Sequence, residues 1–434
     1  DGVMPPVDAV RTEELINYFD YDYALPDSPD EPFTADVALF DSPWDEGSQL
    51  LRIGLQGYDL PVEERPRANL VFLIDTSGSM DSPDKLPLLK RSLRMLVEQM
   101  DDDDTIAIVA YAGTAGVVLE PTGGDRRAKI LAALDRFRPG GSTAGAEGIR
   151  QAYQLAESAF DEDAVNRVIL ATDGDFNVGI SDPARLEDFV ERKRETGVYL
   201  SILGFGRGNL NDHLMQTLAQ AGNGNAAYID SLMEARKVLV DEMGSTLFTI
   251  ADDVKVQIEF NPAFVAEYRL IGYETRLLAR EDFNNDRVDA GEVGSGHSIT
   301  ALYEITAPDS PSRLVDQLRY GDPADVAAPD GGELAFLRIR YKQPGAADSR
   351  LIERPILADA GTTFDAAPAD ARFAAAVAGF GQLLRNDPNV ETLTFAAVHD
   401  IARDARGEDG FGYRSEFLRL VRLAESASAI ETLN

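Results

Sequence analysis

Residues 75–79, with the sequence Asp-Thr-Ser-Gly-Ser, place three oxygen-bearing side chains at alternate positions. They directly follow "NLVFLI", a continuous apolar run of the kind that forms a parallel strand covered on both faces. The carboxylate of Asp75 and the hydroxyls of Ser77 and Ser79 are therefore expected on a tight turn where a buried strand ends. Such oxygens suit a hard divalent cation, which needs further ligands from other turns.

Two other segments can supply those ligands. "GGSTAG" places Thr143 just before a helical pattern, and "ATDGDFN" ends a strand-like run with Asp173 and adds Asp175. Ligands of an open parallel sheet collect at the carboxyl ends of its strands, so the three segments should meet at one edge. Asp175 is expected to be a turn residue outside the site. The predicted metal ligands are Asp75, Ser77, Ser79, Thr143 and Asp173.

The composition of this oxygen set favours Mg²⁺, which prefers near-octahedral oxygen ligands and keeps some water; Mn²⁺ or Ca²⁺ could replace it. Hydroxyls are neutral, so only two carboxylates balance the charge of the ion. We therefore expect an electrophilic ion with an open position that suits an Asp or Glu of a partner protein. The alternative is that the hydroxyls only cap helices. Capping explains each hydroxyl alone, but it does not explain two aspartates at strand ends.

The elements around these turns alternate between strand and helix from residue 69 to residue 248. Apolar runs such as "TIAIVAYA", "NRVILATD" and "YLSILGFG" alternate with amphipathic helical patterns such as "DKLPLLKRSLRMLVEQM". This alternation predicts a doubly wound parallel sheet in a domain at about residues 68–248.

The flanking regions show different patterns. Residues 1–67 contain a short helical pattern and two strand-like runs, residues 249–345 contain alternating strands typical of an antiparallel sheet, and residues 346–434 are predicted to be helical. Two isolated strands cannot bury a face alone, so we expect the N-terminal pair to join the strands of 252–342. The predicted fold class is α/β, with the doubly wound domain inserted in an antiparallel β domain and followed by a C-terminal helical segment.

Composition excludes several classes of function. The 434-residue chain has 41 basic and 75 acidic residues, a net charge of −34, which disfavours nucleic acids and anionic lipid surfaces. The same charge attracts cations and basic partners, or serves solubility alone. With no cysteine there is no disulfide and no thiolate metal site. No apolar run reaches the roughly 18 residues of a membrane span. Because the first residue is Asp1, we expect a processed or trimmed chain.

Signs of catalysis are weak. The sequence has no nucleophile elbow and no phosphate-binding glycine motif, and none of its three histidines stands in a catalytic pattern. A metal-dependent hydrolase would need a general base, for which only Asp175 is a candidate. The acidic loop that begins at Asp282 lacks the glycine of a calcium-binding loop and has Val293 where the bidentate Glu belongs, so we interpret it as solvated. We therefore expect a protein that is not an enzyme.

The three oxygen-bearing segments resemble the metal-ion-dependent adhesion site (MIDAS) of von Willebrand factor type A (VWA) domains. The resemblance covers "DTSGSM", "GGSTAG" and "ATDGDFN", in the family's order, and it implies the Rossmann-like doubly wound fold over about residues 68–248. It further implies that Ser77, Ser79 and Thr143 bind the ion directly. Asp75 and Asp173 would act mainly through waters or through hydrogen bonds to the ligands.

The flanks resemble those of bacterial YfbK-type VWA proteins, through "PPVDAVRTEELINYFDYDY" and the region that begins "EYRLIGYETRLLARED". Because members often carry an export or lipoprotein signal, the resemblance implies a place in the cell envelope, periplasmic or at the surface; the cytoplasm is the alternative. The expected function is metal-dependent protein binding in adhesion or assembly. The alternatives are a metal-dependent hydrolase, or a structural metal with recognition by the flanking domains.

Overall fold

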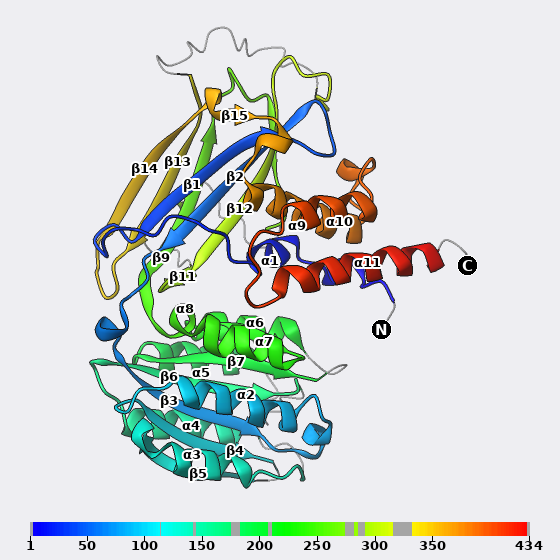
Figure 1. Ribbon diagram of the computed structural model, residues 1–434. Helices are drawn as coiled ribbons and strands as arrows, with labels where there is room; N and C mark the ends of the chain where they lie inside the picture. The colour runs from blue at the N-terminus through cyan, green and yellow to red at the C-terminus, as the bar shows by residue number, and fades with distance from the viewer. Residues whose placement is uncertain are drawn as a thin grey trace. The chain divides into compact units, whose positions relative to one another are not determined.

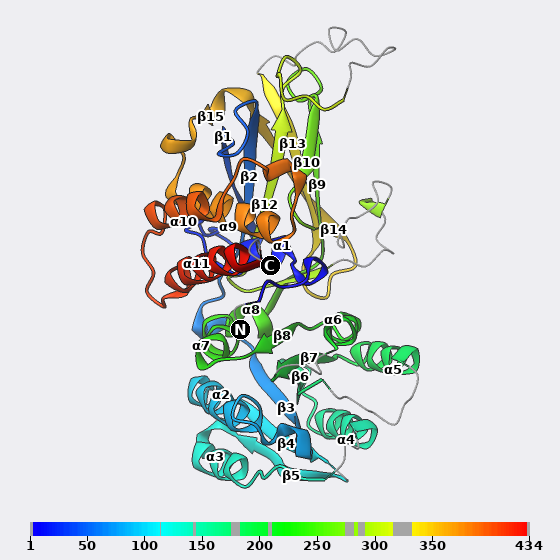
Figure 2. The ribbon, with the colours of Figure 1, turned by 90° about the vertical axis from the view of Figure 1, so that its right-hand side faces the viewer.

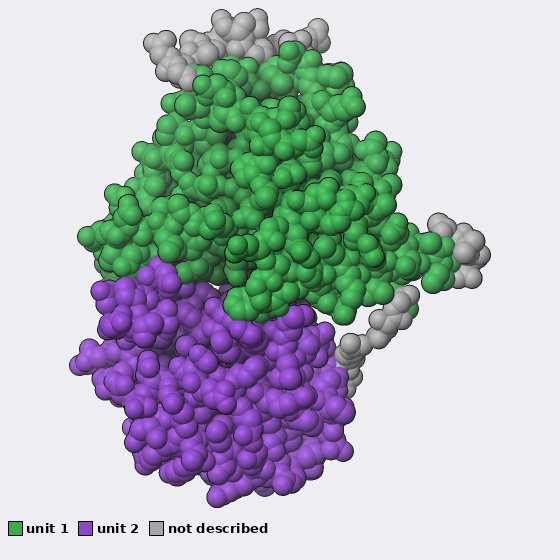
Figure 3. All heavy atoms as spheres, viewed as in Figure 1, with its two compact units in different colours: residues 1–58, 250–291, 296–434 green, residues 59–249, 292–295 purple. Residues whose placement is uncertain are grey.

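A computed structural model of the chain describes residues 3–112, 114–141, 145–174, 183–206, 211–273, 282–284, 291–315 and 332–431. The chain forms two compact units, coloured separately in Figure 3. Unit 1 consists of Asp1–Tyr58, Ile250–Gly291 and Gly296–Asn434, and unit 2 consists of Asp59–Thr249 and Glu292–Ser295. Unit 2 is therefore an insertion in the sequence of unit 1.

The sheet of unit 2 has six strands in the order β5-β4-β3-β6-β7-β8. All neighbouring strands are parallel except the edge strand β5, which is antiparallel to β4. The strands are β3 (Arg67–Asp75), β4 (Thr105–Tyr111), β5 (Ala115–Gly123), β6 (Ala164–Thr172), β7 (Val198–Phe205) and β8 (Ala226–Ile229).

Helices cover both faces of this sheet because its central strands are apolar on both faces. In β3, Leu70 and Phe72 belong to one buried cluster, and Val71 and Leu73 belong to another on the opposite face. Figure 2 shows α2, α3 and α7 on one side of the sheet and α4, α5 and α6 on the other. The helices are α2 (Leu86–Gln99), α3 (Arg127–Asp135), α4 (Gly145–Ser158), α5 (Pro183–Arg194), α6 (Asp212–Ala221), α7 (Leu232–Arg236), the π-helix η5 (Lys237–Asp241) and α8 (Met243–Leu247).

Unit 1 contains two sheets (Figure 1), one ordered β10-β12-β2-β1-β15 and one that includes β9-β13-β14 in that order; most of the short strand β11 is assigned to unit 2. In the first sheet, β2 pairs antiparallel with β1 on one side and with β12 on the other. Strands that precede and follow unit 2 in the sequence therefore share one sheet, as the predicted fold class requires. The strands are β1 (Phe33–Asp41), β2 (Ser48–Gly57), β9 (Thr249–Phe260), β10 (Glu267–Leu270), β11 (Gly291–Gly294), β12 (Ser298–Thr306), β13 (Glu333–Lys342), β14 (Ser349–Leu357) and β15 (Gly361–Thr362).

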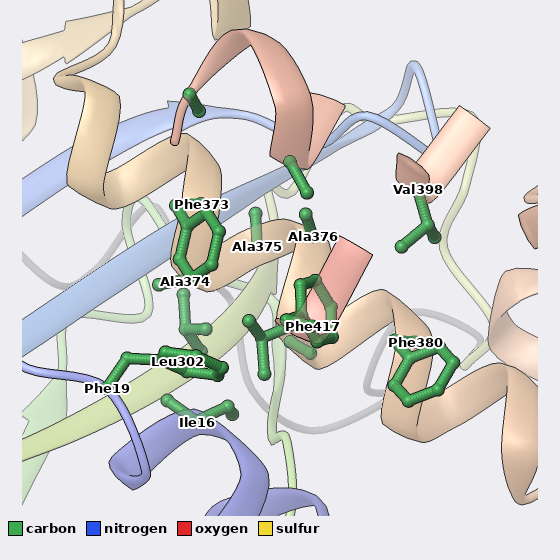
Figure 4. Close-up of a cluster of buried hydrophobic side chains, with 14 of the residues drawn as sticks. Ile16, Phe19, Leu302, Phe373, Ala374, Ala375, Ala376, Phe380, Val398 and Phe417 are labelled. Atoms are coloured by element: carbon green, nitrogen blue, oxygen red, sulfur yellow. The ribbon is translucent and has the colours of Figure 1, made fainter. Parts of the chain in front are cut away.

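The helices of unit 1 share a core with the first sheet. They are α1 (Thr12–Asn17), α9 (Ala369–Leu384), α10 (Phe395–Asp404) and α11 (Tyr413–Glu431). The rings of Phe19, Phe373 and Phe417 meet edge to face, with centroids 5.1–5.6 Å apart (Figure 4). Leu302 of β12 belongs to the same buried cluster, so the helices close one face of the sheet. Helix α9 is buried nearly all round, which its small alanine side chains permit.

Two segments differ from the predicted organisation. Residues 346–434 begin with strands rather than with a helix, because β14 pairs with β13 along its whole length. The sequence of β14, "SRLIERPIL", gives little sign of a strand because its side chains are mostly exposed, as is usual at a sheet edge. Residues 59–67 belong to unit 2, where Leu60 packs against a buried cluster. Among the described helices, none combines the length and apolar character needed to span a bilayer.

Candidate metal centre

The first predicted segment forms a compact turn at the carboxyl end of β3. Asp75 is the last residue of the strand and is fully buried. The backbone N–H of Ser77 donates a hydrogen bond of 2.8 Å to Asp75 Oδ1. A 3₁₀ turn, η3 (Gly78–Asp81), then follows, and it brings Ser79 Oγ to 3.0 Å from Ser77 Oγ. The turn thus gathers the carboxylate and both hydroxyls that the spacing predicted.

The second predicted carboxylate comes from the neighbouring strand. Strands β3 and β6 pair in parallel, with Ile74 opposite Ala171, so both end at the same edge of the sheet (Figure 1). Thr172 donates a long hydrogen bond of 3.4 Å from Oγ1 to Asp75 Oδ2, and Asp173 follows directly with its side chain buried. The structure therefore brings Asp75 and Asp173 to the same edge of the sheet, at the carboxyl ends of β3 and β6. This edge is called the metal rim below.

Thr143 and Asp175 lie outside the described residues, so their side chains are not placed. The segment "GGSTAG", which contains Thr143, is described only as far as Gly141. This part is hydrogen-bonded to the turn that follows β3. Gly140 N–H donates to the carbonyl of Thr76 at 2.9 Å, and Gly78 N–H donates to the carbonyl of Gly141 at 3.2 Å. The chain thus enters the segment of Thr143 beside the hydroxyl pair.

Lys85 is a site residue that the sequence reasoning missed. Its Nζ donates to Asp173 Oδ2 at 2.9 Å and to the carbonyl of Ser79 at 3.0 Å, and its side chain is 13% exposed. Its carbon stem crosses Gly206, directly after β7, where φ is +80° and an added Cβ would lie 2.2 Å from Lys85 Cε. Nothing in "DSPDKL" marks this lysine as reaching the end of another strand. Lys85 therefore joins the ends of β3, β6 and β7.

Burial sets the electrostatics of this rim. The pKa of the Asp75 carboxyl is raised, first by burial and then by the charge of Asp173, although hydrogen bonds from Ser77 oppose the shift. The pKa of the fully buried Tyr111 on the adjacent strand is raised strongly, also by burial first and by the charge of Asp75 second. Negative charge at the rim is therefore costly, and a bound cation would relieve that cost.

Two observations fit the residues to a divalent ion. Asp173 Oδ1 is buried and has no hydrogen-bond partner within the described part of the chain, an arrangement that costs free energy unless another group binds it. Adjacent ligands of an octahedral Mg²⁺ lie about 2.9 Å apart, because each metal–oxygen bond is about 2.0–2.1 Å. The separation of 3.0 Å between Ser77 Oγ and Ser79 Oγ matches that spacing.

Nowhere in the described residues, the rim included, do three or more His, Asp or Glu side chains gather in a way that could hold a metal. Most of the acidic loop after Asp282 lies outside the described ranges, so its interpretation as a solvated loop stays a prediction. The rim of unit 2 contributes two carboxylates, and its other candidate ligands are neutral hydroxyls.

Comparison with known families covers nearly the whole chain. Residues 69–241 match the von Willebrand factor type A domain, residues 245–427 match the family described as "Uncharacterized protein YfbK, C-terminal", and residues 1–52 match the family described as "von Willebrand factor". The match to the VWA domain spans the six-stranded sheet of unit 2, and the YfbK match spans most of unit 1 that follows it.

Among the individual relatives, the first named below is similar enough to show the family. "Uncharacterized protein YfbK" of Escherichia coli (strain K12) is 46% identical over 436 residues, which cover 99% of this chain and 75% of the relative. "Uncharacterized protein sll0103" of Synechocystis sp. is 29% identical over 314 residues, 70% of this chain and 69% of the relative. The solved structure of "von Willebrand factor type A from Catenulispora acidiphila" is 17% identical with a TM-score of 0.48, covering 93% of this chain and 91% of that one. The chain therefore belongs to the YfbK family of VWA-domain proteins.

Proposed function

We propose that the chain is a metal-dependent protein-binding module in which a divalent cation, Mg²⁺ by preference, meets an acidic residue of a partner protein. VWA domains commonly mediate metal-dependent protein interactions. Ser77, Ser79 and Thr143 would hold the ion, and Asp75 and Asp173 would act through waters or hydrogen bonds. When bound, the ion supplies a positive charge with a coordination position open to a carboxylate.

One observation carries this proposal. Asp173 Oδ1 is buried without a hydrogen-bond partner among the described residues, at the same rim as the hydroxyl pair of Ser77 and Ser79. Helix capping, the alternative for the hydroxyls, leaves that oxygen without a partner. A cation, or a water bound to it, gives the oxygen a partner and uses the hydroxyls at the same time.

Binding is favoured over hydrolysis because both described carboxylates already accept hydrogen bonds. Asp75 accepts from Ser77 N–H and from Thr172, and Asp173 accepts from the Lys85 ammonium. A general base has to be free to take a proton from water. The Lys85 ammonium occupies Asp173 Oδ2, the oxygen that would otherwise be open to a water.

The test of the ion site is titration calorimetry with Mg²⁺ and Mn²⁺. We expect the double variant Ser77→Ala/Ser79→Ala to lose affinity by about 100-fold or more, since even groups that only orient metal ligands contribute 10–100-fold. The control is Ser82→Ala, which lies in the same loop but bonds to Asp84. Equal affinity in the double variant and the control would refute the assignment.

A pull-down with the full chain tests the role of the ion in binding. EDTA should release a partner captured in Mg²⁺, and Ser77→Ala/Ser79→Ala should capture none. A partner that stays bound in EDTA would instead indicate a structural metal, with recognition by unit 1. We also propose a place in the cell envelope, which the family resemblance supports. Fractionation of cells that express the natural gene tests it, and recovery in the cytoplasm would contradict it.

A further inference from the structure

A groove of about 360 Å³ lies within unit 2, between the first half of α2 and the segment that follows α3. Its apolar lining comes from Leu86 and Pro87 on α2 and from Phe137 and Pro139 after α3. This volume is within the range of ligand-binding pockets, which start near 300 Å³. Helices α2 and α3, which flank these lining residues in the sequence, lie on the same side of the sheet in Figure 2.

Basic side chains surround this apolar lining. Lys90, Arg91, Arg94 and Arg138 all line the groove, although the chain as a whole has 75 acidic residues against 41 basic ones. The one acidic residue that lines it is Asp81. The groove is therefore a local concentration of positive charge on a strongly acidic protein.

Most of this charge is not neutralised within the protein. Arg94 forms an ion pair with Asp135. In contrast, Arg91 donates to the carbonyl of Pro87, and Arg138 donates to the carbonyls of Asp135 and Phe137. Neither of these two guanidinium groups has a carboxylate within ion-pair distance in the described part of the chain.

Repulsion among the cations shows that they lie close together. The pKa of Lys90 is lowered, by burial first and then by the charges of Arg138 and Arg94, while Asp135 opposes the shift. Like charges held this close cost free energy in the absence of a ligand. An anionic group bound in the groove would relieve that repulsion.

Two residues that line the groove are close in sequence to the turns of the candidate metal centre. Asp81, which lines it, is the last residue of the turn that begins directly after Ser77. On the other side, Pro139 leads into Gly140, whose N–H donates to the carbonyl of Thr76. The chain therefore leads from each wall of the groove into a turn of the metal centre within a few residues.

From this arrangement we propose that the groove binds a second acidic residue, with apolar neighbours, on the same partner segment whose first carboxylate meets the ion. The proposal rests on the proposed function and specifies the partner as a segment with two separated carboxylates. The basic side chains of the groove select negative charge, and its apolar lining favours a peptide over a phosphate-rich polymer. The overall charge of −34 also disfavours such a polymer.

The test uses the full chain in Mg²⁺ and fluorescein-labelled synthetic peptides of Gly, Ser and Leu. One peptide carries a single Glu, others carry a second Glu next to Leu at increasing spacings, and matched peptides have Gln in place of the second Glu. Binding is measured by fluorescence anisotropy to the wild type and to Arg91→Glu/Arg138→Glu. The control Arg126→Glu/Arg136→Glu makes the same charge change at exposed positions of unit 2 that do not line the groove.

At one spacing or more, we expect the second Glu to raise affinity about tenfold over Gln. The gain should disappear in Arg91→Glu/Arg138→Glu, persist in the control, and shrink as salt rises. If the single-Glu peptide binds with Mg²⁺ but the second Glu adds nothing, the groove proposal fails and the proposed function stands. If two-Glu peptides bind with the same affinity in EDTA as in Mg²⁺, but lose affinity in Arg91→Glu/Arg138→Glu, the groove binds a carboxylate and the proposed function fails. Binding of polyphosphate in preference to every peptide would also overturn the groove proposal.

Discussion

At the scale of single residues, Asp75 shows how burial and function conflict. Its carboxyl is fully buried, and burial raises its pKa above the ordinary value of 3.8. A folded-state pKa above the unfolded value means that the folded protein holds this proton more tightly. The contribution of Asp75 to stability is thus fully present below the unfolded pKa and is lost as the pH rises through the folded pKa. At neutral pH the ionised Asp75 destabilises the metal-free protein.

Asp75→Asn should therefore raise the melting temperature of the metal-free protein at pH 7 by a few °C, and should raise it less near pH 4. The amide oxygen can still accept the hydrogen bond from Ser77, but the buried charge is gone. The same variant should bind Mg²⁺ more weakly, as titration calorimetry would show. A melting temperature that falls at pH 7 would contradict this account of the site.

Lys85 gives a second prediction at this scale. Its ammonium bonds to Asp173 Oδ2, so it competes with a divalent ion for the same carboxylate. Removing a positive charge beside a cation site lowers the repulsion, so Lys85→Met should raise Mg²⁺ affinity roughly three- to tenfold. Lys129→Met, on α3, removes the same charge from unit 2 and should leave affinity unchanged. Weaker binding by Lys85→Met would show instead that Lys85 is needed to position Asp173.

At the scale of elements, much of the architecture was predictable because each strand of unit 2 has a local signal. The apolar run that ends at Asp75 predicted a parallel strand buried on both faces, and β3 has that environment. Strand ends that share an edge then predicted that Asp75 and Asp173 would meet. The pairing of β3 with β6 produces that arrangement.

Other features had no local signal. The strand β14 was missed because its sequence lacks the alternation of apolar and polar residues. Lys85 was missed because its contact with Asp173 depends on how two loops approach in three dimensions. The indole N–H of Trp44 donates to buried Glu304, a residue 260 positions later, and no local pattern marks that contact. Sequence patterns thus predict elements well, but they predict contacts between loops poorly.

A prediction for elements concerns the aromatic cluster between α9, α11 and the segment after α1. Phe373 is fully buried and contacts the rings of Phe19 and Phe417 edge to face. Phe373→Ala should destabilise unit 1 by about 3–5 kcal/mol in urea denaturation, because it leaves a large cavity. Leu423→Ala, at a side chain that is 54% exposed on α11, should change stability little. Equal effects of the two substitutions would contradict the packing described here.

At the scale of the whole molecule, each unit has its own hydrophobic core. One buried cluster lies in unit 1, and two others lie on the two faces of the unit 2 sheet. We therefore expect two transitions in differential scanning calorimetry. Mg²⁺ should raise the temperature of one transition only, because a ligand stabilises the unit that binds it. Phe373→Ala should lower the other. A single transition that responds to both changes would show that the units unfold together.

The insertion of unit 2 also has a consequence for biosynthesis. The hairpin of β1 and β2 leaves the ribosome early, but Leu55 pairs with Ile299 of β12, which is made only after all of unit 2. Until then the free side of β2 is an unpaired edge strand, a feature that promotes aggregation in nascent chains. If the intervening polypeptide folds first, the flexible loop between β2 and β12 becomes shorter, and the entropy cost of closing it falls. The middle of the nascent chain should thus become native first, and its two flanks should be completed last.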